Sequence, residues 1–592
     1  MRLRSRSWLS WIMLVVGVVA SLAAAYGAYT LAGYAWNQVV TYKSPYVRQP
    51  GVAETSPTTL WVPPGMEPAV DASAPVLSRR VVLVIVDGMR LDVSRSRMPT
   101  MNKLRAFGSD TTLTVPQPSL SYPNWTTILT GAPQTISGVT TNGYEGRVAV
   151  PTIMEMATLA GRRVEVVGPA DFATLFGVEP GPNVSLRPWP KGGYLSGTLI
   201  DDALRIAKST DPQLIVIHLP DLDEAGHSYG GASKEYADVA HKIDVDLNRL
   251  VNGLQRTDTT FVIVADHGHI DSGGHGGWES SAVQVPGVFA GAGIRLGSGT
   301  GNLEQVSPTI ALLAGIPTPP YAAARALSAV VATTSPLVFA SDSAHHVAFD
   351  AHYVDVVGRG TGTVNSTQVR GSGPAEADAL AAQARDERLA AERSGRALTA
   401  LLTVLGALAV MGAIGLASWR ALAAALSGAA AYYVLYSALF FWVHRFNWSL
   451  SAFNTETHVK AFMNGRMVEA IISGIVGVAV AGAIYPLLRK TPRSPRDRWF
   501  LGGWLALAPA TVLAIQATLA MQIAWYYWWY GVSITWILPD FKWAFKADLD
   551  MVQMTALGAV AIVGPLVTYL VGRYHPKLAN GTVARAATSS KT

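Results

Sequence analysis

The sequence contains no cysteine among its 592 residues. This absence excludes a disulfide-stapled scaffold, thiolate metal sites and a cysteine nucleophile. Charged residues are also scarce: they make up 15% of the chain, against about 25% in ordinary soluble domains. With 50% hydrophobic residues and a mean hydropathy of +0.26, the composition excludes a disordered chain and a wholly soluble one. A chain of this length is expected to form about two or three domains.

The low fraction of charged residues arises mainly from long apolar runs. The first extends from Ser7 to Tyr42 after an arginine-rich start, and its core of roughly 20 residues is long enough to span a bilayer. A cleaved signal peptide begins in the same way, but the run is long for one, so we favour an uncleaved anchor over residues 1–42. Further uncharged runs lie at about 397–419, 421–443, 470–488, 499–522 and 551–571. Buried helices of a soluble protein are the alternative, which so many runs in one region disfavour.

Basic residues set the expected orientation of these six spans, because cytoplasmic loops are enriched in Lys and Arg. If the helices alternate, one side receives the N-terminal arginines, Arg420, the basic residues of 489–498, Arg573 and Lys577. Both termini are therefore expected in the cytoplasm and residues 43–396 outside, in an integral protein of the plasma membrane. This topology explains the net charge of +6, so no nucleic acid partner is expected.

The expected outer loops are about 444–467 and 526–550. The second loop carries the aromatic run Tyr526–Tyr530, which suits the boundary between lipid and water. The apolar runs between the loops contain almost no ionisable residue, which disfavours a transporter or a proton relay.

The outer segment has the pattern of an α/β domain. The runs 81–86, 213–219 and 260–265 are apolar and rich in β-branched residues without alternation, as in strands buried on both faces of a parallel sheet. Helical patterns between them predict a doubly wound, mostly parallel sheet beside an α-helical transmembrane region. The predicted order is an anchor over 1–42, a linker over 43–78, a catalytic domain over 79–335, an accessory region with a charged helix over 336–396, and a five-helix membrane domain with a cytoplasmic tail over 397–592.

Polar side chains follow all three strands. They are Asp87 after the first, Asp223 and His227 after the second, and Asp266, His267 and His275 after the third. The carboxyl ends of such strands meet at one edge of the sheet, where ligands bind. A lone Asp at a strand end is more often a turn or cap residue, but carboxylates and imidazoles after three strands indicate a metal site. Without thiolates these ligands suit zinc, with manganese or iron as alternatives, and they are numerous enough for two ions.

A candidate nucleophile lies in the segment Ser121–Thr130. Pro123 suits the first turn of a helix, so Ser121 is expected at or beside the helix N-cap. Capping is the simplest role for this serine. The positive end of a helix and a metal ion would also stabilise its alkoxide, so capping is compatible with nucleophilic attack in an in-line phosphoryl displacement.

Together these motifs resemble the alkaline phosphatase superfamily, and within it the type I phosphodiesterase/nucleotide pyrophosphatase branch. The segment Ser121–Asn124 is similar to the nucleophile segment of that branch, in which Thr is usual at the first position. Asp223–His227 resembles its D-x-x-G-H metal motif, and Asp266–Gly268 resembles its D-H-G motif. His275 with the two glycines after it is closer to the glycosylphosphatidylinositol (GPI) ethanolamine-phosphate transferases.

The resemblance implies two divalent metal ions, zinc in the first place and manganese as the alternative. One ion would be held by Asp223, His227 and His275, and the other by Asp87, Asp266, His267 and the Ser121 oxygen. Asn124 would donate to a phosphoryl oxygen in the transition state. Outside the matched positions, Asp221 and His269 are expected to support the site or the fold, and His345, His346 and His352 are expected at the surface.

The implied activity is that of a membrane-bound, metal-dependent phosphodiesterase that works outside the cytoplasm through a phospho-serine intermediate. The alternative is a phosphoethanolamine-type headgroup transferase with a lipid-linked acceptor, because those enzymes have a similar order of segments. The expected partners are a phosphodiester or lipid-linked phosphate and membrane lipids, and a homodimer stays open. A sulfatase is disfavoured, because Trp125 stands where its motif needs Arg. A non-catalytic metal-binding membrane protein is disfavoured by the intact ligand set.

Overall fold

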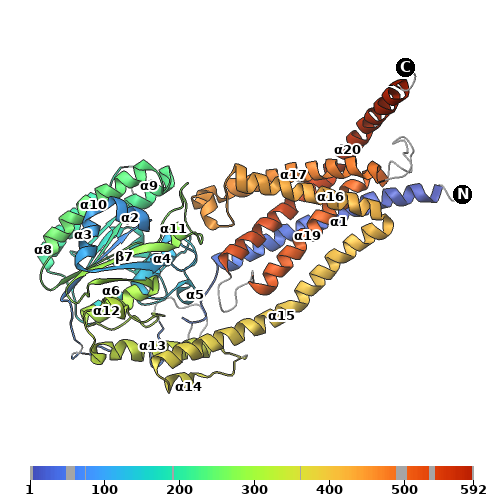
Figure 1. Ribbon diagram of the computed structural model, residues 1–592. Helices are drawn as coiled ribbons and strands as arrows, with labels where there is room; N and C mark the ends of the chain where they lie inside the picture. Colours follow the sequence, from blue (N-terminus) through green and yellow to red (C-terminus); the bar gives the residue numbers. More distant parts are fainter. Residues whose placement is uncertain are drawn as a thin grey trace.

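The computed structural model describes residues 4–47, 61–71, 73, 75–189, 193–360, 362–488, 503–531 and 540–589. A domain built on one sheet lies at one end of the molecule, and a bundle of long helices extends from it (Figure 1). The basic residues of 489–498 and much of the linker predicted over 43–78 lie outside the described residues. The predicted domain boundaries stay a prediction.

Eight strands form a single sheet in the order β4-β3-β5-β1-β6-β7-β2-β8. Their bounds are β1 Arg80–Val86, β2 Ser109–Thr114, β3 Val164–Pro169, β4 Val184–Arg187, β5 Leu214–Leu219, β6 Thr259–Val264, β7 Gln284–Gly291 and β8 Gly297–Asn302. All strands run parallel except β7, which is antiparallel to both β6 and β2. Every residue of β1, β5 and β6 is buried, as their apolar runs predict. The predicted fold class is confirmed.

Helices cover both faces of the sheet (Figure 1). On one face lie α2 (Leu91–Arg97), α3 (Pro99–Phe107), α8 (Ser196–Thr210), α9 (Asp221–Tyr229) and α10 (Lys234–Leu254). The other face is covered by α4 (Ser121–Thr130), α6 (Ile153–Leu159) and α12 (Val306–Ala314). Shorter helices are α5 (Gln134–Ser137), α7 (Asp171–Phe176) and α11 (Ser280–Val283). The loops that leave the carboxyl ends of β1, β5 and β6 therefore converge in the middle of the domain.

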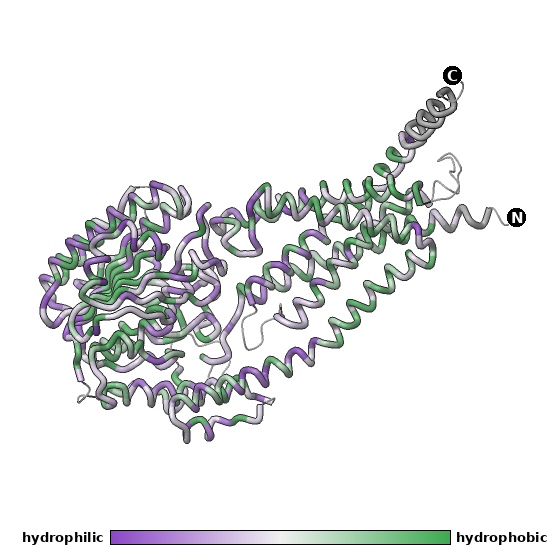
Figure 2. Tube along the Cα trace, viewed as in Figure 1, coloured by the Kyte–Doolittle hydropathy of each residue, from purple (hydrophilic) through white to green (hydrophobic). Residues whose placement is uncertain are grey.

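Six of the described helices are long and apolar enough to span a membrane. They are α1 (Arg4–Val40), α15 (Pro374–Ala417), α16 (Trp419–Ser437), α17 (Val459–Leu487), α19 (Leu507–Trp529) and α20 (Phe541–Ser589). Figure 2 shows their hydrophobic colouring continuing through the bundle. This finding agrees with the six predicted spans and supports an integral membrane protein. The helix α15 begins in its charged part and continues without a break into its apolar part.

Two of these helices extend beyond the apolar runs. Because α17 begins at Val459 and α20 at Phe541, parts of the predicted outer loops are helical. The extensions bury charged residues, so the expectation of almost no ionisable residue in the helices is wrong at these ends. Two buried charge pairs lie within single helices: Arg466 lies 2.7 Å from Glu469, and Lys546 pairs with Asp550. Such pairing compensates the loss of water around each charge and lets the helix continue.

The accessory helices α13 (Pro336–Val357) and α14 (Ser366–Arg370) pack against α15. Here the surface position expected for the histidines is wrong for His346 and His352, which are buried. His346 Nε2 lies 2.6 Å from Asp378 Oδ1 of α15, and His352 Nε2 donates to the Tyr46 carbonyl at 2.8 Å. His345 is partly exposed. The polar contacts of these rings hold α13 to neighbouring segments, which explains their burial.

The β3 residue Glu165 is fully buried, and neither of its carboxylate oxygens has a hydrogen-bond partner among the described residues. Burial raises the pKa of Glu165 from its ordinary 4.5 to about 8. Its contribution to stability is therefore complete below pH 4.5 and is lost as the pH rises through 8. We expect Glu165→Met to raise the free energy of unfolding at pH 8 by about 1–3 kcal/mol, with a smaller gain at pH 5.

Thermal unfolding of the purified chain in detergent at pH 5 and pH 8 measures this difference. The exposed Glu179 supplies a matched control, because Glu179→Met leaves the core unchanged. An equal melting temperature for wild type and Glu165→Met at pH 8 would contradict the prediction.

Candidate active site

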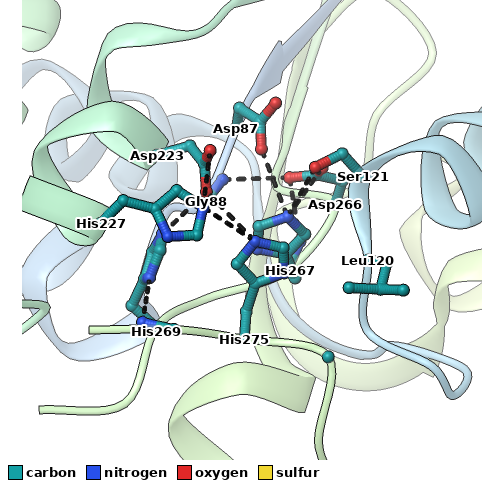
Figure 3. A network of polar contacts seen from close by, with 12 residues as sticks. Asp87, Gly88, Leu120, Ser121, Asp223, His227, Asp266, His267, His269 and His275 are labelled. Atoms are coloured by element: carbon teal, nitrogen blue, oxygen red, sulfur yellow. Dashed lines mark hydrogen bonds and ion pairs between the residues drawn. The ribbon is translucent and has the colours of Figure 1, made fainter. Parts of the chain in front are cut away.

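The candidate site lies where the loops after β1, β5 and β6 converge on the start of α4. Seven of the eight predicted site residues come together there, namely Asp87, Ser121, Asp223, His227, Asp266, His267 and His275. Figure 3 shows their side chains pointing toward one another from separate loops and helix starts. Their polar atoms form two adjoining groups.

Group 1 consists of Asp87, Asp266 and His267, whose ligand atoms all lie within 4.8 Å of one another. His267 Nε2 is 3.3 Å from Asp87 Oδ1 and 3.4 Å from Asp266 Oδ2. Ser121 Oγ lies 3.2 Å from the same nitrogen. The three members are fully buried, and Asp87 Oδ1 has no hydrogen-bond partner among the described residues. A buried carboxylate oxygen left in this way is suited to a cation.

Group 2 consists of Asp223, His227 and His275. His227 Nε2 is 3.4 Å from Asp223 Oδ2 and 3.2 Å from His275 Nε2. Two imidazole nitrogens and a carboxylate oxygen therefore converge on one point. The His275 ring also stacks on the ring of His267, with centroids 3.7 Å apart, so the two groups are in direct contact.

Each of the three ligand histidines bonds to an oxygen through Nδ1. His267 donates to the Gly268 carbonyl at 3.2 Å, and His275 donates to the Ser119 carbonyl at 2.9 Å. His227 Nδ1 lies 2.9 Å from the side-chain oxygen of Asn454, in the membrane region. These bonds place a proton on Nδ1 and turn Nε2 toward the group, which is the arrangement of metal-binding histidines. The residues present therefore fit two metal ions.

The carboxylates are oriented by residues that the sequence analysis did not single out as site members. His218 Nε2 lies 2.9 Å from Asp87 Oδ2, and Trp125 Nε1 donates to Asp266 Oδ2 at 2.9 Å. His218 was detectable as a polar residue inside the otherwise apolar strand β5. His269 Nε2 lies 2.8 Å from Asp223 Oδ1, in agreement with the supporting role expected for it. Asp221 accepts from backbone N–H groups at the start of α8, in agreement with its expected role in the fold.

Ser121 is the first residue of α4, after Leu120 at the N-cap. Its hydroxyl is therefore next to the positive end of the helix dipole, as the position of Pro123 predicted. Its side chain is almost fully buried and lies against group 1. A phosphoryl group bound between the two groups would be within reach of this oxygen.

Asn124 lies apart from the two groups. Its amide nitrogen donates to the carbonyls of Pro118 and Leu120, and its oxygen accepts from Gln134. Contact with a phosphoryl oxygen requires these bonds to be exchanged, so the role expected for Asn124 stays a prediction.

Burial and neighbouring charges shift the pKa values of group 1 and group 2 differently. Burial raises the pKa of Asp87, and the neighbouring carboxylate of Asp266 raises it further. Burial lowers the pKa of His275 well below its ordinary value. Although burial lowers it, the pKa of His227 rises to about 9, because Asp223 lies beside the ring. A cation in group 1 would therefore stabilise the charged forms of Asp87 and Asp266. In group 2, a cation would replace a proton on His227.

Part of the chain matches a known protein family. Residues 81–155 and 183–278 match the family model described as type I phosphodiesterase / nucleotide pyrophosphatase. The predicted resemblance is confirmed. The matched residues include every member of group 1 and group 2 together with Ser121.

Curated relatives match part of this chain, and each is longer than the stretch that matches. GPI ethanolamine phosphate transferase 1 of Yarrowia lipolytica is 25% identical over 258 residues, covering 37% of this chain and 27% of that protein. GPI ethanolamine phosphate transferase 3, catalytic subunit, of Homo sapiens is 25% identical over 277 residues, covering 40% and 25%. The chain thus matches about a quarter of the length of these relatives. Among solved structures, wild-type alkaline phosphatase PafA aligns with a TM-score of 0.37 at 12% identity, over 44% of this chain and 100% of that chain.

Protonation of His227 predicts that the metal affinity of group 2 depends on pH. A metal ion must displace this proton below about pH 9, so we expect the affinity of group 2 for zinc to rise about tenfold for each pH unit between 6.5 and 8.5. Chelator competition on the purified full chain at several pH values measures it. The slope should disappear in His227→Ala, and an affinity that is independent of pH in the wild type would contradict the prediction.

Proposed function

We propose that this protein is a metal-dependent phosphoryl-transfer enzyme in which Ser121 attacks a phosphodiester. The observation that carries the proposal is the position of Ser121 Oγ at the start of α4, 3.2 Å from His267 Nε2 and beside two metal-ligand groups. We further propose zinc as the metal, because the ligands are imidazoles and carboxylates without thiolate. Manganese is the alternative.

The chemistry has two in-line steps. Ser121 Oγ forms a bond to phosphorus and loses its proton, while the bond from phosphorus to one ester oxygen breaks and that oxygen leaves as an alcohol. The phospho-serine is then attacked by a second hydroxyl, which loses its proton while Ser121 regains one. The metal ions supply positive charge that stabilises the attacking and leaving oxygens. The helix dipole of α4 lowers the cost of the Ser121 alkoxide in both steps.

The identity of the second hydroxyl separates hydrolysis from transfer. Of the two activities, we propose transfer of a phospho-headgroup to a lipid-linked acceptor, because the curated relatives described above are named ethanolamine phosphate transferases. Phosphodiester hydrolysis is the second candidate and follows when water replaces the acceptor.

The membrane bundle supports a lipid-linked substrate. A cavity of about 140 Å³ lies among the outer ends of α16, α19 and α20, where its lining includes Trp448, Tyr526, Lys546 and Asp550. Trp448 also accepts a hydrogen bond at its carbonyl from Trp278 Nε1, and Trp278 follows His275 closely in the sequence. A mainly aromatic pocket that contains the Lys546–Asp550 pair is thus connected to the segment that carries His275.

Ser121→Ala should lower the turnover of bis-p-nitrophenyl phosphate by about 1000-fold or more, because no other hydroxyl replaces the nucleophile. Ser121→Thr is the matched variant, because it keeps a hydroxyl and should keep measurable turnover. Unchanged turnover in Ser121→Ala, with zinc bound, would refute the proposed nucleophile.

Transfer is tested in proteoliposomes that contain phosphatidylethanolamine with a labelled headgroup and a glycolipid acceptor. We expect the label to move to the acceptor in wild type and to stay in the donor in Ser121→Ala. Release of the label into water, with none on the acceptor, would assign the chain to hydrolysis.

We propose that both termini are cytoplasmic and that the sheet domain lies outside the plasma membrane, as the basic residues predict. A cysteine placed after Gly371, in a chain that has none of its own, should react with an impermeant maleimide in intact cells. Reaction only after permeabilisation would place the domain in the cytoplasm.

A further inference from the structure

A loop of the membrane region reaches the metal site. This α16–α17 loop, residues 444–458, connects the π-helical turn after α16 to the start of α17. In Figure 1 it lies at the end of the bundle nearest the sheet domain. It contributes side chains to both segments that carry the histidines of group 2.

The first contact is made by Asn454 with His227. The amide nitrogen Nδ2 donates to the His227 carbonyl at 2.9 Å, which fixes the orientation of the carboxamide. The amide oxygen therefore faces His227 Nδ1, which donates to it at 2.9 Å. The ring is held in the tautomer that presents Nε2 to Asp223 and His275.

The second contact is made by two serines with the segment after His275. Ser449 and Ser451 donate through their hydroxyls to Glu279 Oε2 at 2.9 and 3.0 Å. Ser451 Oγ also accepts from the Gly277 N–H at 3.1 Å. The turn that follows the ligand His275 is therefore held by the membrane region.

The glycines around His275 make room for this loop. A Cβ atom on Gly274 would lie 2.4 Å from the Ser451 carbonyl oxygen and 2.9 Å from Asn454 Cα. A Cβ atom on Gly277 would lie 1.7 Å from Ser449 Oγ. All three distances to the loop are shorter than real Cβ contacts allow, so larger residues at these positions would displace parts of it. The glycine-rich sequence is thus shaped to the membrane loop as well as to the metal site.

The backbone at Asn454 is strained. Its φ of 63° and ψ of −62° place it at the centre of a γ-turn, which is closed by the bond from Thr455 N–H to the Phe453 carbonyl at 2.8 Å. This form of γ-turn is rare and costs a residue with a side chain about 1–3 kcal/mol. Strain of this kind persists where the surrounding contacts impose it, and here those contacts are with a metal ligand.

We propose that Asn454 is a positioning residue of the catalytic centre, which orients His227 for the metal ion of group 2 from the membrane region. The inference rests on the proposed function, because it presumes that group 2 binds a metal. Its consequence is that metal retention by the outer domain depends on a loop between two membrane helices.

The variant Asn454→Gly separates positioning from folding. Glycine adopts positive φ readily, so the melting temperature should be unchanged or higher. The affinity of one zinc ion should nevertheless fall about 10–100-fold, the usual effect of losing a hydrogen-bond partner of a metal-binding histidine, while the other ion is held as before. Asn454→Asp keeps an acceptor for His227 Nδ1 and should recover most of the affinity. Thr457→Ala, an exposed change in the same loop, is the matched control.

Zinc affinity is measured on the full chain in detergent by chelator competition, and the absorption of the cobalt-substituted protein reports the geometry of the ligands. A wild type that binds no metal overturns the proposed function itself. Two zinc ions in wild type with equal affinities in Asn454→Gly overturn the positioning role alone. A loss of affinity that Asn454→Asp does not recover would also overturn it, because the acceptor oxygen would then be irrelevant.

Discussion

The crowding of buried carboxylates at one edge of a parallel sheet is the constraint on which the site depends. Asp87, Asp223 and Asp266 follow three neighbouring strands, and parallel pairing brings their oxygens together away from water. Buried like charges repel, so such an arrangement needs positive charge among them. The histidines and the positive end of α4 supply part of it, and the proposed metal ions would complete it. The same positive charge would stabilise the alkoxide of Ser121, which lies beside these carboxylates.

Much of this arrangement could be predicted from the sequence. Strands buried on both faces have unbroken apolar runs, so β1, β5 and β6 were recognisable, and the polar residues at their ends follow in register. The motifs around Ser121 and His275 indicated the nucleophile and the ligand groups, because they resemble those of a known family. The bundle was predictable because an apolar run of about 20 residues has few other uses.

The remaining features depend on contacts that no local pattern contains. Asn454 meets His227 across 227 positions of sequence, and nothing around it differs from an ordinary polar loop. The outer ends of α17 and α20 were assigned to loops because charge normally ends a membrane span. There Arg466 pairs with Glu469 and Lys546 with Asp550 within one helix, a pairing that the spacing of these residues allows but does not require. His346 and His352 were expected at the surface because no motif surrounds them, and their contacts with Asp378 and Tyr46 join segments far apart in the sequence.

The distance in sequence between Asn454 and His227 also sets an order of events during synthesis. The sheet domain, with all of its own ligands, leaves the ribosome well before the α16–α17 loop exists. Until that loop has been made and the helices on either side have been inserted, Asn454 is not in place beside His227 Nδ1. The enzyme would therefore acquire its full affinity for metal only after its membrane anchor is in place. Maturation of the catalytic centre would then report successful insertion into the lipid bilayer.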